Sequence, residues 1–207
     1  MVSTCLENVE GFPDYIQRCL ANHSGDVNQD VPANFRKAAV IMPLLLVDDE
    51  WQVLFTRRSD TVQDHKGQVS FPGGASEEMD AGPAETACRE LQEEIGISSK
   101  DVKVLGQLQD MRTITSFTVT PVIGVIPWPV VVTPNPNEVA RVFKIPLCWL
   151  ADPDHWEERL YRLLDGSEHP VIFYDEYDGE LLWGVTARIV LNFLEQVGLP
   201  KDLHSQG

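Results

Sequence analysis

The chain has 207 residues, of which 43% are hydrophobic and 23% are charged. This length and composition fit one globular domain. With 32 acidic and 16 basic residues, the formal net charge is −16. That excess disfavours nucleic acids and anionic membranes as main partners, because both are dense in negative charge. A small anionic ligand is not excluded, since a local cation or a bound metal ion can outweigh the overall field.

No feature of the sequence suggests export or membrane insertion. The N-terminus lacks a basic start followed by an apolar core of signal-peptide length. The longest apolar run, 38–47, is about half of a membrane span and suits a buried strand. The four cysteines are widely spaced without a CxxC pair, as expected for free thiols in a reducing compartment. We therefore expect a cytoplasmic protein.

Helix and strand signals occur in mixed order along the chain. Apolar groups at helical spacing predict a helix within 7–21, and a loop follows. Two apolar runs, 38–47 and 52–56, flank three acidic residues and predict a β-hairpin. An initial Pro and a following Gly predict a helix over 83–95, and a final helix is expected over 185–197. Further strands are expected at 68–71, 102–108, 117–126, 138–143, 161–164, 171–174 and 180–182, with a proline-rich loop at 127–136. This pattern indicates an α/β or α+β fold with a mixed sheet.

The predicted helix over 83–95 carries an unusual set of acidic residues. At 100° per residue its apolar side chains form one arc, and Glu90, Glu93 and Glu94 fall together on the adjacent arc. Glu93 and Glu94 occupy the last turn, where the helix dipole disfavours anions. Such hard oxygen ligands suit Mg²⁺ or Mn²⁺, which bind through a few carboxylates and substrate phosphate. The alternative is a solvated acidic face without a ligand.

The residues around this helix resemble the signature of the Nudix hydrolases. That signature has Gly, five residues, Glu, seven residues, and then Arg-Glu-apolar-x-Glu-Glu-x-Gly-apolar. The chain has Gly74, then Asp80, then Arg-Glu-Leu-Gln-Glu-Glu-Ile-Gly-Ile at 89–97. The second half matches at every fixed position. In the first half, Asp80 stands in place of Glu, and eight residues rather than seven precede Arg89.

This resemblance implies an α/β/α sandwich with a central mixed sheet over 36–198, preceded by an N-terminal helix and loop over 1–35 and followed by a tail over 199–207. It also implies the roles of several residues. Mg²⁺ or Mn²⁺ would be held by Glu90, Glu94 and Glu93, with a backbone carbonyl of Gly73 or Gly74. Arg89 would orient the glutamates rather than contact substrate. The base that activates water stays open between Glu93 and Glu138.

The segment before the signature resembles one Nudix subgroup, the coenzyme A pyrophosphatases. The subgroup pattern is Leu-Leu-Thr-x-Arg-Ser, a spacer, and then Gly, three residues and Phe-Pro-Gly-Gly, which corresponds here to 54–59 and 67–74. Phe55 replaces Leu, and Gln63 replaces an Arg of the spacer. Further similarity occurs at 137–139 and 183–188. The resemblance implies substrate contacts from Arg58, Arg57, Ser59, His65, Gly67 and Gln68. Strand alternation would direct Arg57 and Arg58 to opposite faces, so we expect at most one of them, Arg58, to reach the ligand.

The function expected from these resemblances is metal-dependent hydrolysis of the diphosphate of coenzyme A or its derivatives. The products would be 3′,5′-ADP and 4′-phosphopantetheine. Gln63 keeps open another substrate, such as ADP-ribose, and a non-catalytic nucleotide-binding module is a further alternative. Because Nudix hydrolases are often homodimers, the resemblance also implies a homodimer.

Overall fold

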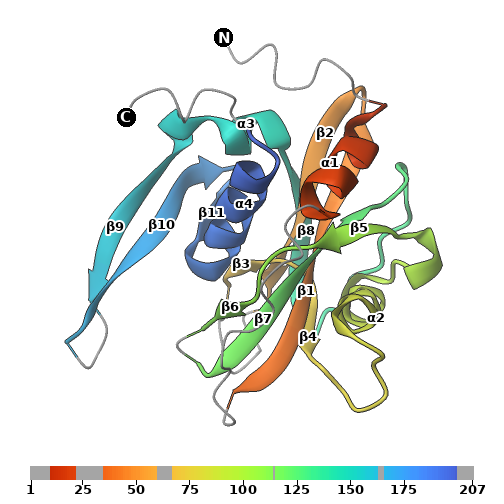
Figure 1. The fold of residues 1–207 in the computed structure, drawn as a ribbon, viewed down its shortest axis with the longest axis horizontal. Coiled ribbons are helices and arrows are strands. Elements are labelled where there is room, and N and C mark those ends of the chain that lie inside the picture. Colours follow the sequence, from red (N-terminus) through yellow and green to blue (C-terminus); the bar gives the residue numbers. More distant parts are fainter. Residues whose placement is uncertain (1–9, 22–34, 60–66, 114, 163–165, 200–207) are drawn as a thin grey trace.

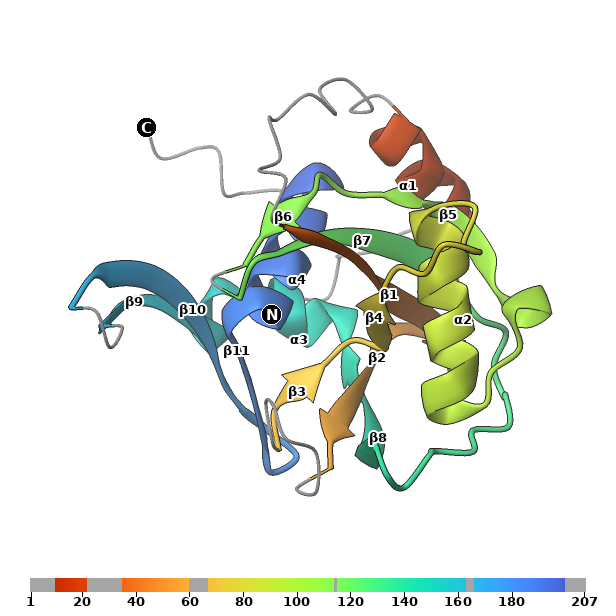
Figure 2. The same cartoon turned by 90° about the horizontal axis from the view of Figure 1, so that it is seen from below.

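The computed structural model describes residues 10–21, 35–59, 67–113, 115–162 and 166–199. A central sheet lies between helix α2 on one face and helices α1 and α4 on the other (Figures 1 and 2). The helices are α1 (Phe12–Ala21), α2 (Pro83–Ile95), α3 (Leu147–Ala151) and α4 (Gly184–Gln196). The central sheet comprises β1 (Arg36–Val47), β2 (Glu50–Arg58), β3 (Val69–Ser70), β4 (Gly73–Ala75), β5 (Lys103–Gln107), β6 (Met111–Arg112), β7 (Phe117–Val125) and β8 (Val139–Pro146). The predicted α/β/α sandwich is confirmed.

Strand β1 connects the parts of the central sheet. It runs parallel to β7 and antiparallel to both β2 and β4, so the sheet is mixed, as predicted. The main strand order is β3-β2-β1-β7-β5, while β8 pairs with β2. The first half of β1 pairs with β4 and its second half pairs with β2. This arrangement brings Gly74 of β4 against Glu90 of α2, while Gly73 lies against the backbone of β1.

Two apolar cores lie on the two faces of this sheet. Met42 and Leu44 of β1 join the core beneath α1 and α4, whereas Ile41 and Leu45 join the core beneath α2. This division follows from the alternation of side chains along a strand. Because β1 is buried on both faces, its sequence is a nearly continuous apolar run, which explains the strength of the sequence signal.

Helix α2 has the bounds that its sequence predicts. Pro83 begins the helix, and Gly96 ends it in the left-handed conformation with φ of 76°. The carbonyls of the last turn find partners in the loop that precedes β8. The Thr133 N–H donates to the Ile95 carbonyl at 2.8 Å, and the Asn135 N–H donates to the Glu94 carbonyl at 2.8 Å. The proline-rich loop is therefore fixed to the C-terminal end of α2.

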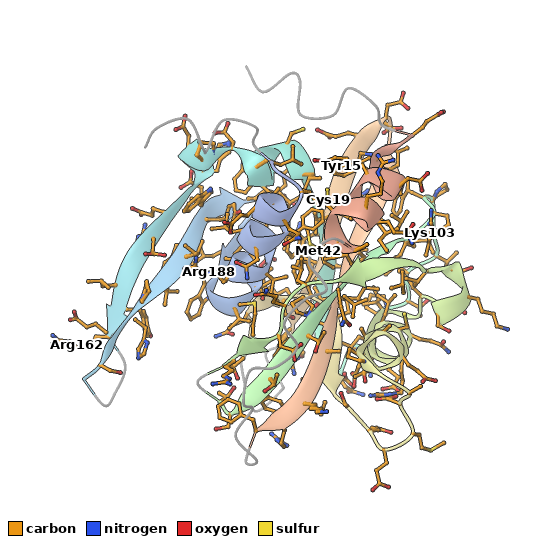
Figure 3. All side chains as sticks on the ribbon, viewed as in Figure 1. Tyr15, Cys19, Met42, Lys103, Arg162 and Arg188 are labelled. Carbon is orange, nitrogen blue, oxygen red and sulfur yellow. The ribbon has the colours of Figure 1, made fainter. Side chains whose placement is uncertain are left out.

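A second sheet extends to one side of the molecule (Figure 1). It consists of β9 (Trp156–Arg162), β10 (Glu168–Tyr177) and β11 (Glu180–Trp183). Arg188 of α4, labelled in Figure 3, donates to Glu158 of β9 at 2.8 Å. Glu180 of β11 forms ion pairs with Arg57 of β2 and Arg141 of β8, at 3.6 and 3.1 Å. These charged contacts attach the second sheet to α4 and to the central sheet.

The helix predicted within 7–21 is α1, and its apolar side chains join the core that it shares with α4. Phe12, Ile16 and Leu20 are buried in the core shared with α4. The Tyr15 hydroxyl (Figure 3) donates to the Val197 carbonyl at 2.9 Å. None of the described helices is both long and apolar enough to span a membrane. The boundaries at 1–35, 36–198 and 199–207 stay predictions, and much of the first and last segments lies outside the described residues.

The packing of α2 generates a prediction about stability. Leu91 is fully buried on the sheet face of α2, whereas its neighbour Gln92 is exposed. Leu91→Ala should lower the free energy of unfolding by about 2–5 kcal/mol, because it removes buried methyl groups and leaves a cavity. Gln92→Ala is the control and should stay within about 0.5 kcal/mol of the parent. Urea titration followed by circular dichroism measures both, and equal effects would contradict this orientation of α2.

Candidate active site

The three glutamates of α2 differ strongly in exposure. Glu94 is only 4% exposed, and the side chain of Glu90 is 15% exposed. The Glu93 side chain is 56% exposed. Two carboxylates therefore lie under the helix against the β4 edge, while the third lies at the surface.

Gly74 allows α2 to approach the sheet closely, and Gly73 allows β4 to lie against β1. A Cβ on Gly74 would lie 2.5 Å from Cδ of Glu90, so the carboxylate occupies the space where a side chain would be. A Cβ on Gly73 would lie 2.5 Å from the Ala39 carbonyl oxygen, so Gly73 is required by the backbone of β1. A main-chain hydrogen bond from Gly73 also reaches Glu94. The Gly73-Gly74 pair thus lies against both buried carboxylates, and we call this pair the glycine floor.

Arg89 connects these glutamates to the loop that precedes α2. Its Nη1 donates to Glu90 at 2.9 Å and to Glu93 at 3.2 Å. Its Nη2 donates to the Ala75 carbonyl at 3.1 Å, and its Nε donates to Asp80 at 3.1 Å. Through these contacts, Arg89 holds Glu90 and Glu93 to the loop before α2.

Asp80 closes the loop between β4 and α2. Besides Arg89, its carboxylate accepts hydrogen bonds from the Glu77 N–H and the Thr86 hydroxyl, both at 2.9 Å. These donors, with Arg89 the strongest, hold the pKa of Asp80 well below its usual range. This loop has Asp in place of the signature Glu and one residue more than the signature. Donors of the loop and of α2 satisfy the Asp80 carboxylate, so we expect a structural role for it.

Burial makes the two inner carboxylates costly to ionise. It raises the pKa of Glu94 to about 8, against the opposing influence of Arg58 and of the Gly73 hydrogen bond. Burial also raises the pKa of Glu90, despite the hydrogen bond from Arg89. Glu138 adds to both shifts through its negative charge. A divalent cation between these groups would favour their charged forms, so the donor set fits Mg²⁺ or Mn²⁺.

The prediction that three carboxylates converge needs correction. Among the residues that the structure describes, no three Asp, Glu, His or Cys side chains are grouped as a metal centre. Glu93 is drawn toward Arg89 on the outer side of α2. The described residues therefore provide Glu90 and Glu94 as a carboxylate pair. A pair of this kind suits an ion that keeps water and substrate oxygens among its ligands.

The two arginines at the end of β2 lie on opposite faces, as strand alternation predicts. Arg57 forms its ion pair with Glu180 on the side of the second sheet. The charge of Arg58 acts on Glu94, on the side of α2. Nε of Arg58 is buried and has no hydrogen-bond partner within the described part of the chain. Arg58 is therefore brought to Glu94, and its buried Nε still lacks an acceptor within the described residues.

Other predicted substrate contacts are placed by main-chain hydrogen bonds. The Arg58 N–H donates to the Gln68 carbonyl at 3.0 Å, and the Ser59 N–H donates to the Glu138 carbonyl at 2.8 Å. Ser59 is buried, and Gly67 lies in a turn with φ of 66°. The structure thus brings β2, the turn before β3 and the start of β8 together beside Glu94. His65, Gln63 and Lys66 lie outside the described residues.

Glu138 lies in the same region and is held there by Asn135, a residue that the sequence did not single out. Nδ2 of Asn135 donates to Oε1 of Glu138 at 3.0 Å. The main chain of Asn135 is bonded to Glu94, as described above. The only sequence signal for Asn135 is its position between two prolines, which indicates a defined turn but no particular contact.

Comparison with known proteins identifies the family of this site and fold. The NUDIX domain pattern matches residues 35–165, so the chain belongs to the Nudix family. The "Uncharacterized Nudix hydrolase NudL" of Photorhabdus laumondii is 38% identical over 168 residues, covering 79% of this chain and 86% of the relative. The protein of the same name from Yersinia enterocolitica is 36% identical over 170 residues, covering 81% and 84%. The prediction of a Nudix hydrolase is thereby confirmed at the level of the family.

A solved structure supports the fold. The crystal structure of a MutT/nudix family protein from Enterococcus faecalis aligns with a TM-score of 0.52, at 15% identity. The alignment covers 90% of this chain and 73% of that protein. At this identity the similarity concerns the fold alone, and it agrees with the central mixed sheet described above.

The glycine floor generates a second prediction. In Gly74→Ala the new methyl group collides with a side-chain carboxylate that can move, so the protein should fold while Glu90 is displaced. Mn²⁺ binding, measured by electron paramagnetic resonance, should weaken about ten- to a hundredfold. Gly82→Ala is the matched control, because among the described residues no heavy atom lies within 4 Å of a Cβ there. Unchanged Mn²⁺ affinity in a folded Gly74→Ala protein would contradict the proposed contact between the ion and Glu90.

Proposed function

We propose that the protein hydrolyses the diphosphate of coenzyme A or of a coenzyme A derivative in the presence of Mg²⁺ or Mn²⁺. The observation that carries this proposal is the position of the buried Glu90 and Glu94 pair beside Arg58, whose Nε has no partner in the described chain. Two buried carboxylates and one cationic donor together suit a divalent cation, which favours the charged forms of the carboxylates, and an anionic phosphate. The family assignment supports a hydrolase of nucleoside diphosphate derivatives.

The residues that would hold the metal ion are Glu90 and Glu94. A backbone carbonyl of Gly73 or Gly74 is a further candidate ligand, and Glu93 is a candidate through water, since its side chain is at the surface. When held there, a divalent ion would supply charge neutralisation of the diphosphate and activation of a water molecule for attack on phosphorus. Arg89 keeps Glu90 in place by a hydrogen bond of 2.9 Å and neutralises part of the local charge.

The remaining residues bind the substrate and move the proton. Arg58 donates hydrogen bonds to phosphate oxygens, which gives its buried Nε a partner. A water oxygen forms a bond to phosphorus while the bond from phosphorus to the bridging oxygen breaks. Glu138 accepts the proton of that water and is the general base in this proposal, because it lies beside the buried pair and accepts a hydrogen bond at only one oxygen among the described residues. Glu93, held by Arg89 at the surface, is the alternative base.

Coenzyme A is the favoured substrate because the subgroup pattern extends over 54–59 and 67–74. Main-chain hydrogen bonds join Arg58 to Gln68 and Ser59 to Glu138, which supports contacts from this segment. Gln63, in place of the pattern's Arg, favours testing ADP-ribose as the second candidate. A homodimer is proposed from the family resemblance alone.

A panel of diphosphates tests the substrate assignment. Coenzyme A, acetyl-coenzyme A, ADP-ribose and a dinucleoside polyphosphate are each incubated with Mg²⁺ or Mn²⁺, and the products are identified by mass spectrometry. We expect 3′,5′-ADP and 4′-phosphopantetheine from coenzyme A, with the highest kcat/KM of the panel. Faster turnover of ADP-ribose would overturn the choice of coenzyme A. Binding without any phosphate product would favour the non-catalytic module.

Removal of the buried metal-binding charge tests the mechanism. Glu94→Gln preserves shape but removes the negative charge, and it should lower kcat by about 10²–10³-fold, as does the loss of other groups that stabilise transition-state charge. Glu85→Gln, on the exposed first turn of the same helix, should leave kcat close to that of the parent. Turnover of Glu94→Gln within a few-fold of the parent would exclude Glu94 as a ligand.

The two neighbouring arginines of β2 provide a matched comparison. Arg58→Ala should lower kcat/KM about ten- to a hundredfold, because it removes a charge-assisted hydrogen bond to phosphate. Arg57→Ala removes an ion pair with Glu180 on the opposite face and should have the smaller effect on kcat/KM. Steady-state kinetics on the best substrate of the panel measures both. An Arg57→Ala defect as large as that of Arg58→Ala would contradict this assignment.

A further inference from the structure

Asn135 uses its main-chain N–H and carbonyl and both polar groups of its side chain in hydrogen bonds. Its main-chain N–H donates to the Glu94 carbonyl at 2.8 Å. Its carbonyl accepts from the N–H groups of Glu138 and Val139, at 3.0 and 2.8 Å. Its side-chain Oδ1 accepts from the Asn137 N–H at 3.2 Å, and its Nδ2 donates to Oε1 of Glu138 at 3.0 Å. One residue therefore contacts both the last turn of α2 and the carboxylate of Glu138.

We propose that Asn135 is a positioning residue for hydrolysis, which holds the Glu138 carboxylate in a fixed relation to the carboxylate pair on α2. This inference rests on the proposed function, in which Glu138 accepts the proton of the attacking water. Asn135 itself contacts neither the substrate nor the water in this proposal. It acts through the one carboxylate oxygen that it binds.

The chemistry of the two side chains requires an amide at position 135. A carboxylate oxygen only accepts hydrogen bonds, and a main-chain N–H only donates them. The Asn135 side chain must therefore present its NH₂ group to Glu138 and its oxygen to Asn137, and the reverse orientation would break both bonds. An Asp at this position would keep the bond to Asn137 but would face Glu138 with a second carboxylate.

The surroundings of Glu138 show why a fixed position is useful. Within the described residues its side chain accepts one hydrogen bond, at Oε1, so Oε2 is available for water. Its main chain is held on two sides, since its N–H donates to Asn135 and its carbonyl accepts from Ser59. Its charge acts on both Glu90 and Glu94. The one rotatable part, the side chain, is the part that Asn135 holds.

A purely structural role makes a different prediction. If Asn135 served only to form the turn before β8, its Oδ1 bond to Asn137 would be the important one, and Asp would replace it well, because Asp forms such turns readily. If the bond to Glu138 is the important one, Asp should be at least as harmful as Ala. The pair Asn135→Asp and Asn135→Ala therefore separates the two roles.

The first experiment measures kcat and KM of Asn135→Ala and Asn135→Asp on the best diphosphate of the panel. Both variants should lower kcat about ten- to a hundredfold, as a misplaced catalytic group does, while KM and Mn²⁺ affinity change little. Thr133→Ala is the control, because it lies in the same loop and retains its main-chain bond to Ile95. Full activity of Asn135→Asp, or a loss confined to KM or Mn²⁺ affinity, would overturn the positioning role.

The second experiment is a double-mutant cycle with Glu138→Gln. If Asn135 acts through the Glu138 carboxylate, Asn135→Ala should cost almost nothing further in the Glu138→Gln background. Additive losses, or a Glu138→Gln enzyme as active as the parent, would overturn this inference while leaving diphosphate hydrolysis intact. A parent protein that turns over no diphosphate would instead overturn the proposed function, and this inference with it.

Discussion

The approach of α2 to the Gly73-Gly74 edge is the constraint on which the rest of the site depends. It places Glu90 and Glu94 beneath the helix, where water is largely excluded. Burying two neighbouring carboxylates is unfavourable, above all for their charged forms, and the packing of the same helix offsets this cost. Leu91 and Ile95 are fully buried in the core beneath α2, and each such side chain contributes about 1.5–3 kcal/mol by leaving water. The apolar arc of α2 thus holds its acidic arc in place.

Three supports then fix the buried pair from different directions. Arg89 and Asp80 hold the loop before α2, the Gly-Gly strand forms the floor, and the proline-rich loop satisfies the carbonyls at the end of the helix. Asn135 belongs to the last of these supports and extends it to Glu138. A site that is held by several packed elements loses little entropy when it binds an ion, which favours preorganised binding.

The parts of this architecture that the sequence predicts are those with local signals. The bounds of α2 follow from Pro83 and Gly96, and the hairpin of β1 and β2 follows from two apolar runs around an acidic turn. The short strands β4 and β6 and the contact of Asn135 with Glu138 depend on partners distant in sequence, so no local pattern indicates them. Spacing at 100° per residue placed Glu93 with Glu90 and Glu94. Such spacing gives the direction in which a side chain points, but not how far it is buried. In the structure, Arg89 holds Glu93 at the surface.

The net charge of −16 takes on a more specific meaning in this structure. At long range, an acidic surface repels a free diphosphate and attracts divalent cations. At short range, the described residues bring the charges of Arg58 and Arg89 to act on the buried pair, and Arg89 already donates to five oxygens of the loop and helix. Among the described residues, Arg58 carries one positive charge, which is less than the combined charge of two ionised glutamates and a diphosphate. In the proposed function, a divalent cation from solution would supply the missing positive charge, and an acidic chain attracts such cations.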